Sequence, residues 1–117
     1  MRVEVSFKHM KSSDYLSNVI SKDVEKVRRR IKIFKRDDPV HLSLHIEKNP
    51  HKEEYLSWAN LYMPKKVIKS QQKDREPSLS INKVVQALIR QIDKHKAIFE
   101  RRLQRRKVVL DVEEDIT

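Results

Sequence analysis

Alternating hydrophobic and polar residues predict β-strands in four parts of the chain. The alternation is clear over residues 3–7 and recurs over residues 40–47. Residues 55–63 predict a third strand that is rich in aromatic residues, and Pro64 begins a turn into a short fourth strand over residues 67–72. Because a period of two sends successive side chains to opposite faces, each strand is expected to bury one face only.

Apolar residues recur at spacings of three and four in two other segments, which is the pattern of an amphipathic helix. The first apolar stripe consists of Leu16, Ile20, Val24, Val27, Ile31 and Phe34. The second and stronger stripe consists of Ile81, Val84, Val85, Leu88, Ile92, Phe99 and Leu103. Each stripe needs an apolar surface to cover it, so both helices are expected to pack against the sheet.

Polar residues and prolines predict where the two helices begin and end. Residues 12–14, Ser-Ser-Asp, offer N-cap side chains for the first helix. Pro39 ends that helix after about six turns, because the residue before a proline is pushed out of the α region. Ser78 or Ser80 is predicted to cap the second helix, which could run for about 25 residues, or roughly 40 Å.

The resulting order is β-α-β-β-β-α, which predicts an α+β fold of two layers. Three successive strands join by hairpins, the first strand joins them through a helical crossover, and both helices cover one face of a four-stranded sheet. The other face of the sheet is expected to stay open. We assign residues 1–107 to this single domain and residues 108–117 to a flexible acidic tail.

The positive charge of the chain is concentrated in two blocks that fall on the two predicted helices. The formal net charge is +10. Residues 22–36 carry eight Lys or Arg against two acids, and residues 81–107 carry nine against two, whereas residues 37–80 are neutral. A broad cationic surface of that kind attracts polyanions, above all nucleic acid. The alternative is that each basic face is merely solvated, although a solvated face usually mixes the two signs of charge.

The composition argues against several classes of enzyme and cofactor site. The chain has no cysteine, which excludes disulfides and thiolate chemistry, and no glycine, which argues against phosphate-binding loops of the dinucleotide and P-loop types. We therefore expect no catalysis, no cofactor and no small-molecule substrate. The chain begins with a strand pattern and no apolar run approaches the ~18 residues of a membrane span, so we expect a cytoplasmic protein without membrane contact.

The five histidines do not predict a metal site. His41 and His45 have the spacing of a helical metal pair, but four residues on a strand span about 13 Å, which is too far to share one ion. His95 lies at the margin of the second apolar stripe, where we interpret it as a packed residue or a neighbour of phosphate.

The third strand carries large apolar side chains on the face of the sheet that is expected to stay open. If the small Ala59 packs beneath the helices, then Leu56, Trp58 and Tyr62 lie on the opposite face. One interpretation of that face is a platform on which unpaired bases stack. The other is a partly exposed apolar patch that stabilises the sheet by cross-strand pairing or makes a weak protein contact.

Several short segments carry a resemblance to a known family. Residues 90–96, Arg-Gln-Ile-Asp-Lys-His-Lys, match a helical RQ-x-x-K-x-K segment. Shorter matches are residues 80–82, the pair Lys26 and Val27, residues 47–50, and Pro64 followed by Val67 and Ile68. In this order and spacing the chain resembles, over roughly residues 1–98, short members of the ribosome hibernation promoting factor family, the ribosome-associated inhibitor A group, also known as sigma-54 modulation proteins. It departs from the family pattern at residues 76–78, at Trp58 and Tyr62, and in the strongly basic run over residues 101–107.

The resemblance implies a fold like that of a double-stranded-RNA-binding domain and a place of action on the ribosome. That place is the channel between head and body of the small (30S) subunit, over the aminoacyl and peptidyl tRNA sites, where the protein would exclude tRNA and messenger and hold the ribosome idle. The residues carried over as rRNA phosphate contacts are Lys22, Lys26, Arg29, Arg90, Lys94 and Lys96. Lys83 and Arg101 are added on helical phase alone. The acidic end resembles the tails of some short members, and we expect a monomer.

Two other functions fit the same residues. A generic double-stranded-RNA-binding domain would use the basic helix faces without a preference for ribosomes. A protein-interaction module would use the open sheet face around Leu56, Trp58 and Tyr62.

Overall fold

The elements of the fold follow one another in the predicted order. The computed structural model describes the backbone of residues 1–31, 40–64 and 66–116 and the side chains of those up to residue 97. Its elements are β1 Arg2–Lys8, α1 Asp14–Ile31, β2 His41–Lys48, β3 Tyr55–Met63, β4 Lys66–Asp74 and α2 Pro77–Ile116. This confirms the β-α-β-β-β-α order and the α+β class.

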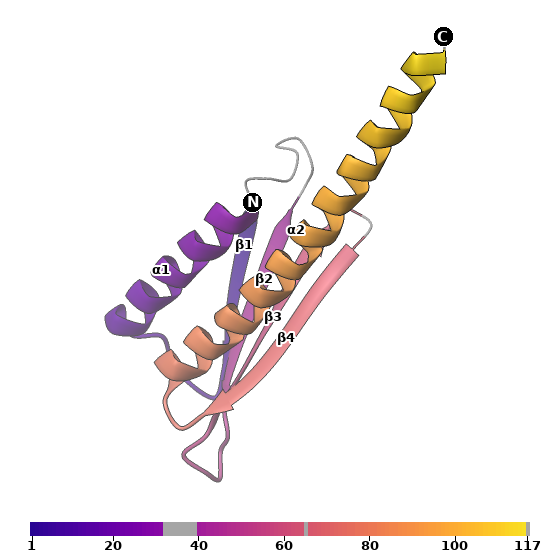
Figure 1. Ribbon diagram of the computed structural model, residues 1–117. Coiled ribbons are helices and arrows are strands. Elements are labelled where there is room, and N and C mark those ends of the chain that lie inside the picture. Colours follow the sequence, from indigo (N-terminus) through magenta and orange to yellow (C-terminus); the bar gives the residue numbers. More distant parts are fainter. Residues whose placement is uncertain (32–39, 65, 117) are drawn as a thin grey trace.

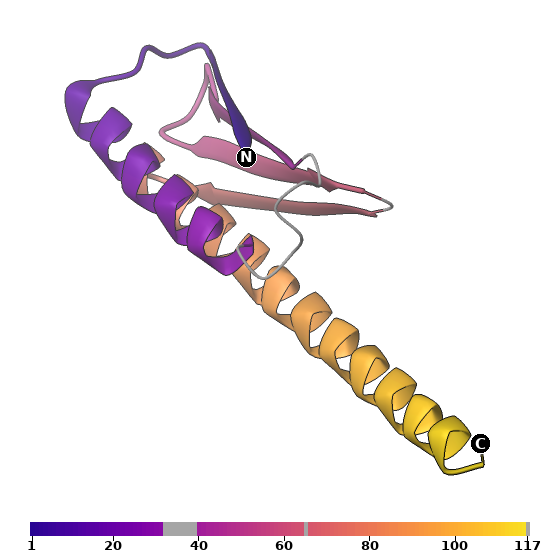
Figure 2. The ribbon, with the colours of Figure 1, turned by 90° about the horizontal axis from the view of Figure 1, so that it is seen from above.

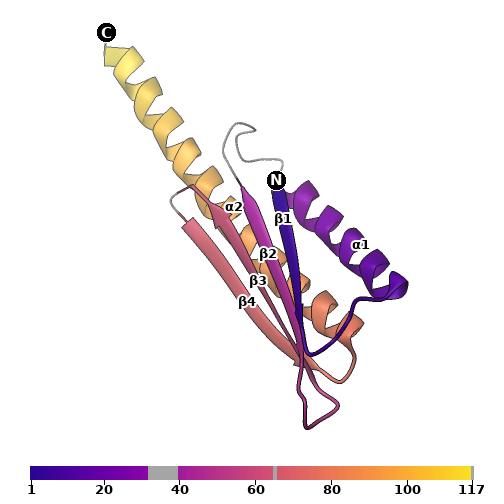
Figure 3. The same ribbon diagram turned by 180° about the vertical axis from the view of Figure 1, so that it is seen from behind.

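The four strands form one mixed sheet in the order β1-β2-β3-β4. β1 pairs with β2 in parallel, whereas β2 with β3 and β3 with β4 pair as antiparallel hairpins. Both helices lie on one face of the sheet (Figure 1, Figure 2). The view from behind shows the other face uncovered, with the strands in front of the helices (Figure 3). The predicted two-layer arrangement is therefore confirmed.

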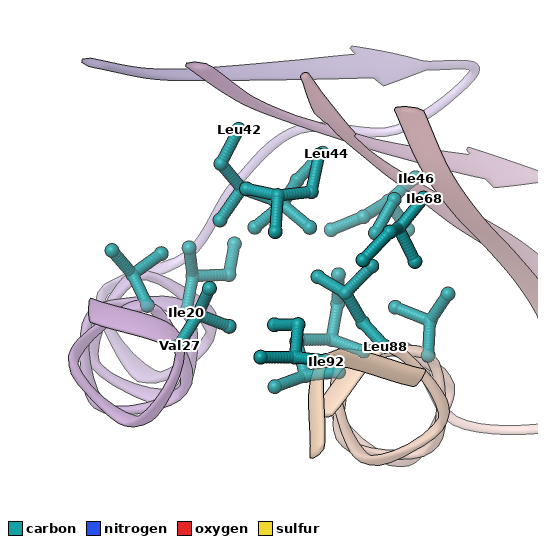
Figure 4. Close-up of a cluster of buried hydrophobic side chains, with 14 of the residues drawn as sticks. Ile20, Val27, Leu42, Leu44, Ile46, Ile68, Leu88 and Ile92 are labelled. Atoms are coloured by element: carbon teal, nitrogen blue, oxygen red, sulfur yellow. The ribbon is translucent and has the colours of Figure 1, made fainter. Parts of the chain in front are cut away.

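Apolar side chains from the covered sheet face and from both helices form a single core (Figure 4). The labelled members of this core are Ile20, Val27, Leu42, Leu44, Ile46, Ile68, Leu88 and Ile92. The alternate residues of β2 in this group are fully buried, and so are the two residues of α2. Burial of each such side chain contributes about 1.5–3 kcal/mol, so the contact between the layers is mainly hydrophobic.

The two helices begin in different ways. Ser13 caps α1 as the sequence predicts, because its Oγ accepts a hydrogen bond from the backbone N–H of Leu16 at 3.1 Å. The prediction of a Ser78 or Ser80 cap for α2 is wrong. That helix begins at Pro77, where a missing N–H costs nothing, and the carbonyl of Glu76 accepts the first helical bond at 3.0 Å.

Ser80 instead joins α2 to the sheet beneath it. Its hydroxyl donates to the Oγ of Ser57 on β3 at 2.7 Å, and both residues are fully buried. Ser70 of β4 makes a second link of this kind, with its hydroxyl donating to the carbonyl of Val84 at 2.8 Å. The hydroxyls of Ser57, Ser70 and Ser80 are therefore satisfied within the two-layer contact, as most buried polar groups are.

The second helix is longer than its apolar stripe predicts. It runs for 40 residues instead of about 25, and residues 108–116, for which the sequence predicts a flexible tail, continue it as helix. The physical reason is that no proline or glycine follows Pro77 to interrupt the helix. The predicted end of the first helix, with Phe34, lies outside the described residues.

One carboxylate is buried among the apolar residues of α1. Asp23 is 3% exposed, and its Oδ1 lies 3.5 Å from the Nζ of Lys26 on the next turn. Its Oδ2 has no hydrogen-bond partner among the residues that the structure describes. Burial raises the pKa of Asp23 above 3.8, and the nearby Lys26 offsets only part of that effect.

We predict that Asp23→Asn stabilises the fold at neutral pH. Because the pKa of Asp23 is raised on folding, the folded chain holds its proton more tightly, so the free energy of unfolding falls as pH rises from 3.8 through the raised pKa. The amide carries no charge to desolvate, and the expected gain at pH 7 is about 1 kcal/mol. Urea unfolding at pH 7 and near pH 4 measures this gain, which should shrink at the lower pH. A less stable variant at pH 7 would mean that the ion pair with Lys26 outweighs the cost of burial.

Candidate nucleic-acid interface

The two helices lie side by side and run in the same direction across the sheet (Figure 1, Figure 2). One ion pair joins them near the C-terminal end of α1, where the guanidinium of Arg30 lies 3.0 Å from a carboxylate oxygen of Asp93 on α2. Because the helices turn their apolar stripes to the same core, their polar sides form one outer surface. We call this surface the helix face.

Six of the eight cations predicted from the sequence are exposed on this helix face. Those with exposed side chains are Lys22, Lys26 and Arg29 of α1 and Lys83, Arg90 and Lys94 of α2. Lys96 is half-buried. Arg101 lies on the backbone of α2 beyond the residues whose side chains are described. The structure thus brings the described cations of the two basic blocks onto one surface.

The cations of the helix face differ in whether an acid already neutralises them. Lys26 pairs with Asp23, and Lys83 pairs with Asp74 of β4. Among the predicted cations of the helix face whose side chains are described, those that pair with no described acid are Lys22, Arg29, Arg90, Lys94 and Lys96. These five residues carry net positive charge on the helix face, and they are the ones best placed to meet an external anion.

Lys83 has a structural role at the start of α2. Its ammonium donates to Oδ2 of Asp74, and this hydrogen bond is the main reason that the pKa of Asp74 lies below 3.8. The backbone N–H of Glu76 adds a bond to Oδ1 of Asp74 at 3.1 Å. Lys83 therefore helps to fasten the turn between β4 and α2, a partnership that helical phase alone does not reveal.

His95 of α2 forms a hydrogen bond with Lys66 of β4, and the sequence does not predict that contact. The ammonium of Lys66, at the start of β4, lies 3.0 Å from Nδ1 of His95 on α2. Since an ammonium can only donate, Nδ1 accepts and the neutral ring carries its proton on Nε2. Partial burial, together with the charges of Lys66 and Lys94, lowers the pKa of His95 below 6.5. The sequence left His95 as either a packed residue or a neighbour of phosphate, and no local pattern in it points to Lys66.

The open face of the sheet carries aromatic rings in pairs across β2 and β3. The ring of His45 stacks on Trp58 with centroids 4.1 Å apart and planes at 28°. His41 meets Tyr62 edge to face at 5.7 Å. Ala59 is fully buried beneath the helices, which confirms the predicted division of β3 into two faces.

The described residues give no support to a metal site or a membrane segment. They contain no group of three or more His, Asp or Glu side chains arranged to hold a metal ion. His41 and His45 are engaged with aromatic neighbours of β3 instead. None of the helices, over the residues described, combines the length and the apolar character that crossing a bilayer requires.

Comparison with known proteins places these observations in a family. The fold is similar to that of the Thermus thermophilus Protein Y N-terminal domain, with a TM-score of 0.65 and 11% identity over 81% of this chain and 99% of that one. It is also similar to a ribosomal subunit interface protein from Coxiella burnetii, with a TM-score of 0.67 and 18% identity over 83% of this chain and 99% of that one. Among curated proteins no sequence match is found.

Family membership follows from the sequence as a whole and not from these distant structural likenesses. The model of one family matches residues 3–100, which span nearly all of β1, the whole of α1, β2, β3 and β4, and α2 as far as residue 100. The description of that family points to an association with the ribosome. The segments of this chain that resemble the family are residues 90–96 of α2 and the shorter matches quoted from the sequence. The chain belongs to the family described as sigma 54 modulation protein / S30EA ribosomal protein.

Proposed function

We propose that this protein binds the rRNA of the small (30S) ribosomal subunit through its helix face and acts there as a hibernation factor, without catalysis. The observation that carries the proposal is the set of five cations on the helix face that pair with no described acid, namely Lys22, Arg29, Arg90, Lys94 and Lys96. Family membership supports the ribosome as the source of the anion. A structural relative is itself named a ribosomal subunit interface protein.

The geometry of the helix face suits a folded RNA surface. Packed helices lie about 8–10 Å apart, so rows of cations on two of them can meet phosphates of two neighbouring backbone segments. Arg29 and Arg90 can each make forked contacts to phosphate oxygens, which a lysine cannot. Recognition would rest on the shape of the RNA backbone, because contacts to phosphate carry no direct sequence information.

A protein bound by this face in the channel between head and body of the small subunit would occupy the space of tRNA over the aminoacyl and peptidyl sites. Its effect would be exclusion: tRNA and messenger could not enter while it is bound, and the ribosome would stay idle. The working compartment would be the cytoplasm, and the binding unit a monomer, since the helix face needs no second copy to be complete. A generic duplex-RNA binder would use the same face, and the experiments below separate the two.

We predict that the double reversal Arg90→Glu with Lys94→Glu abolishes co-sedimentation with small ribosomal subunits. Both side chains are exposed, so the thermal unfolding midpoint should change little. The matched control is Lys48→Glu with Lys52→Glu near the β2–β3 turn, which makes the same change in net charge away from the helix face and should retain binding. Retained co-sedimentation by the helix variant would contradict the proposed interface. Equal affinity of the natural protein for a plain RNA duplex and for subunits would favour the generic binder.

We also predict that the salt dependence of binding separates free cations from paired ones. Affinity should fall by about 10³–10⁵ between 50 and 200 mM salt if six to ten phosphates are engaged. Arg29→Ala and Arg90→Ala should each reduce the slope of log affinity against log salt by about 0.7–0.9. Lys83→Ala should leave the slope unchanged, because Asp74 already holds that ammonium. Equal loss of slope in all three variants would argue against the assignment of the free cations.

A third prediction concerns pH. The pKa of His95 is lowered in the free protein, and a phosphate beside it would favour the protonated ring, so binding should take up a proton. Affinity for the small subunit should therefore rise as pH falls from about 7.5 to 5.5. His95→Gln should flatten this rise, whereas His51→Gln, in the turn after β2, should not. A pH dependence that survives His95→Gln would remove His95 from the interface.

A further inference from the structure

The open face of the sheet has a chemistry that the proposed function does not use. The strand registers place its outward side chains in cross-strand rows, and one central row runs Ser6, His45, Trp58 and Gln71. The next row runs Glu4, Ser43, Asn60 and Lys69. The helices cover the other side of the sheet (Figure 2, Figure 3). A partner on these rows would therefore not compete with one on the helix face.

The indole of Trp58 is held in a fixed position from one side. His45 stacks on it with centroids 4.1 Å apart, and a hydrogen bond of 2.6 Å joins Nδ1 of His45 to the hydroxyl of Ser6 on β1. Since His45 covers the side of the indole toward β2, the opposite side of the ring is the one turned toward β4. A ring fixed in this way loses little conformational freedom when a ligand stacks on it.

A hollow lies on that second side of the indole. It has a volume of about 400 Å³ and is lined by Trp58, Asn60, Lys69, Ser70 and Gln71, all from β3 and β4. Ser70 turns its hydroxyl to the helix layer, so its backbone borders the hollow. The lining thus offers one aromatic surface, two side-chain amides and one ammonium. It contains no acid, and the exposed Lys69 forms no ion pair among the described side chains.

We propose that this hollow binds an unpaired base of single-stranded RNA. The base would stack on the free side of the Trp58 indole, Asn60 and Gln71 would hydrogen-bond its edge, and Lys69 would meet the adjoining phosphate. Only an unpaired base can stack on an aromatic side chain, because a base within a duplex is already stacked on its neighbours. This requirement distinguishes the hollow from the helix face, which would contact the phosphate backbone of paired RNA. The ammonium of Lys69 suits a phosphate and the indole of Trp58 suits a flat ring, and a nucleotide carries both groups, unlike an acidic or purely apolar protein segment.

The inference goes beyond the proposed function and gives the protein two RNA-binding surfaces on opposite sides of one sheet. The helix face would hold structured RNA, and the sheet face would hold an unpaired segment close to it. The two surfaces share no residue and can be tested separately.

The experiment uses the fact that Trp58 is the one tryptophan in the sequence. The full chain is titrated with a short oligoadenylate and, separately, with a blunt RNA duplex of the same nucleotide length, while tryptophan emission is recorded. We expect the oligoadenylate to quench the emission in a saturable way and the duplex to leave it nearly unchanged. The variant Arg90→Glu with Lys94→Glu should still show the quenching, because its changes lie on the helix face. Equal quenching by the duplex, or none by either RNA, would overturn the proposal.

Variants that lack the indole have no tryptophan emission, so their affinity for a labelled oligoadenylate is measured by fluorescence anisotropy instead. Trp58→Ala should weaken that binding by about 5- to 150-fold, whereas Trp58→Phe should lose less. A second variant, Asn60→Ala with Lys69→Ala, leaves the indole and its stacking partner in place and should also weaken binding. Unchanged affinity in both variants would overturn the proposal. Concentration-dependent dimerisation that Trp58→Ala abolishes, without an effect of RNA on the emission, would assign the face to a protein contact instead.

Discussion

Two amphipathic helices share one face of a four-stranded sheet, and every other feature of the molecule depends on that packing. Each helix has one apolar stripe, and a sheet of this width has room for both stripes only if the helices lie next to each other. Their cationic sides must then face outward together. The parallel β1–β2 pair requires a crossover connection, and α1 supplies it on the face of the sheet that α2 also covers (Figure 2). The ion pair between Arg30 and Asp93 joins the helices at the surface, but the buried core holds them there.

The same packing divides the chemistry of the protein between its two sides. On the helix face, like charges accumulate without enough acids to neutralise them, which opposes folding slightly and favours a polyanionic partner. On the open sheet face, charges are fewer and mostly paired, as for Lys8 with Glu47 and Lys73 with Glu54, and aromatic rings occupy the centre. One side suits the backbone of folded RNA, and the other suits flat, uncharged surfaces such as bases.

Periodicity in the sequence was sufficient to predict the order of the elements and the covered face of the sheet, whereas Lys26 and Lys96 entered the set of cations only through the family resemblance. It could do so because burial imposes a period of two on strands and of about 3.6 on helices, as in β2 and α1. The start of α2 was predicted wrongly because Ser80 serves the sheet, through Ser57, and not its own helix. The pairings of Lys83 with Asp74 and of Lys66 with His95 depend on contacts between distant segments. No local pattern can show such contacts, since they are created by the turn geometry and the register of β4.

The length of α2 divides this helix into a part that packs on the sheet and a part that extends beyond it. At about 1.5 Å per residue its 40 residues extend for roughly 60 Å, whereas the nine residues of β4 extend for only about 30 Å. The C-terminal part of the helix therefore projects past the sheet, and none of the other described elements lies beneath it (Figure 1, Figure 2). A solitary helix in water depends on its own backbone bonds and is marginal at such lengths. The projecting turns should consequently melt and exchange their amide hydrogens independently of the two-layer body, so a single unbroken helix belongs to two units of different stability.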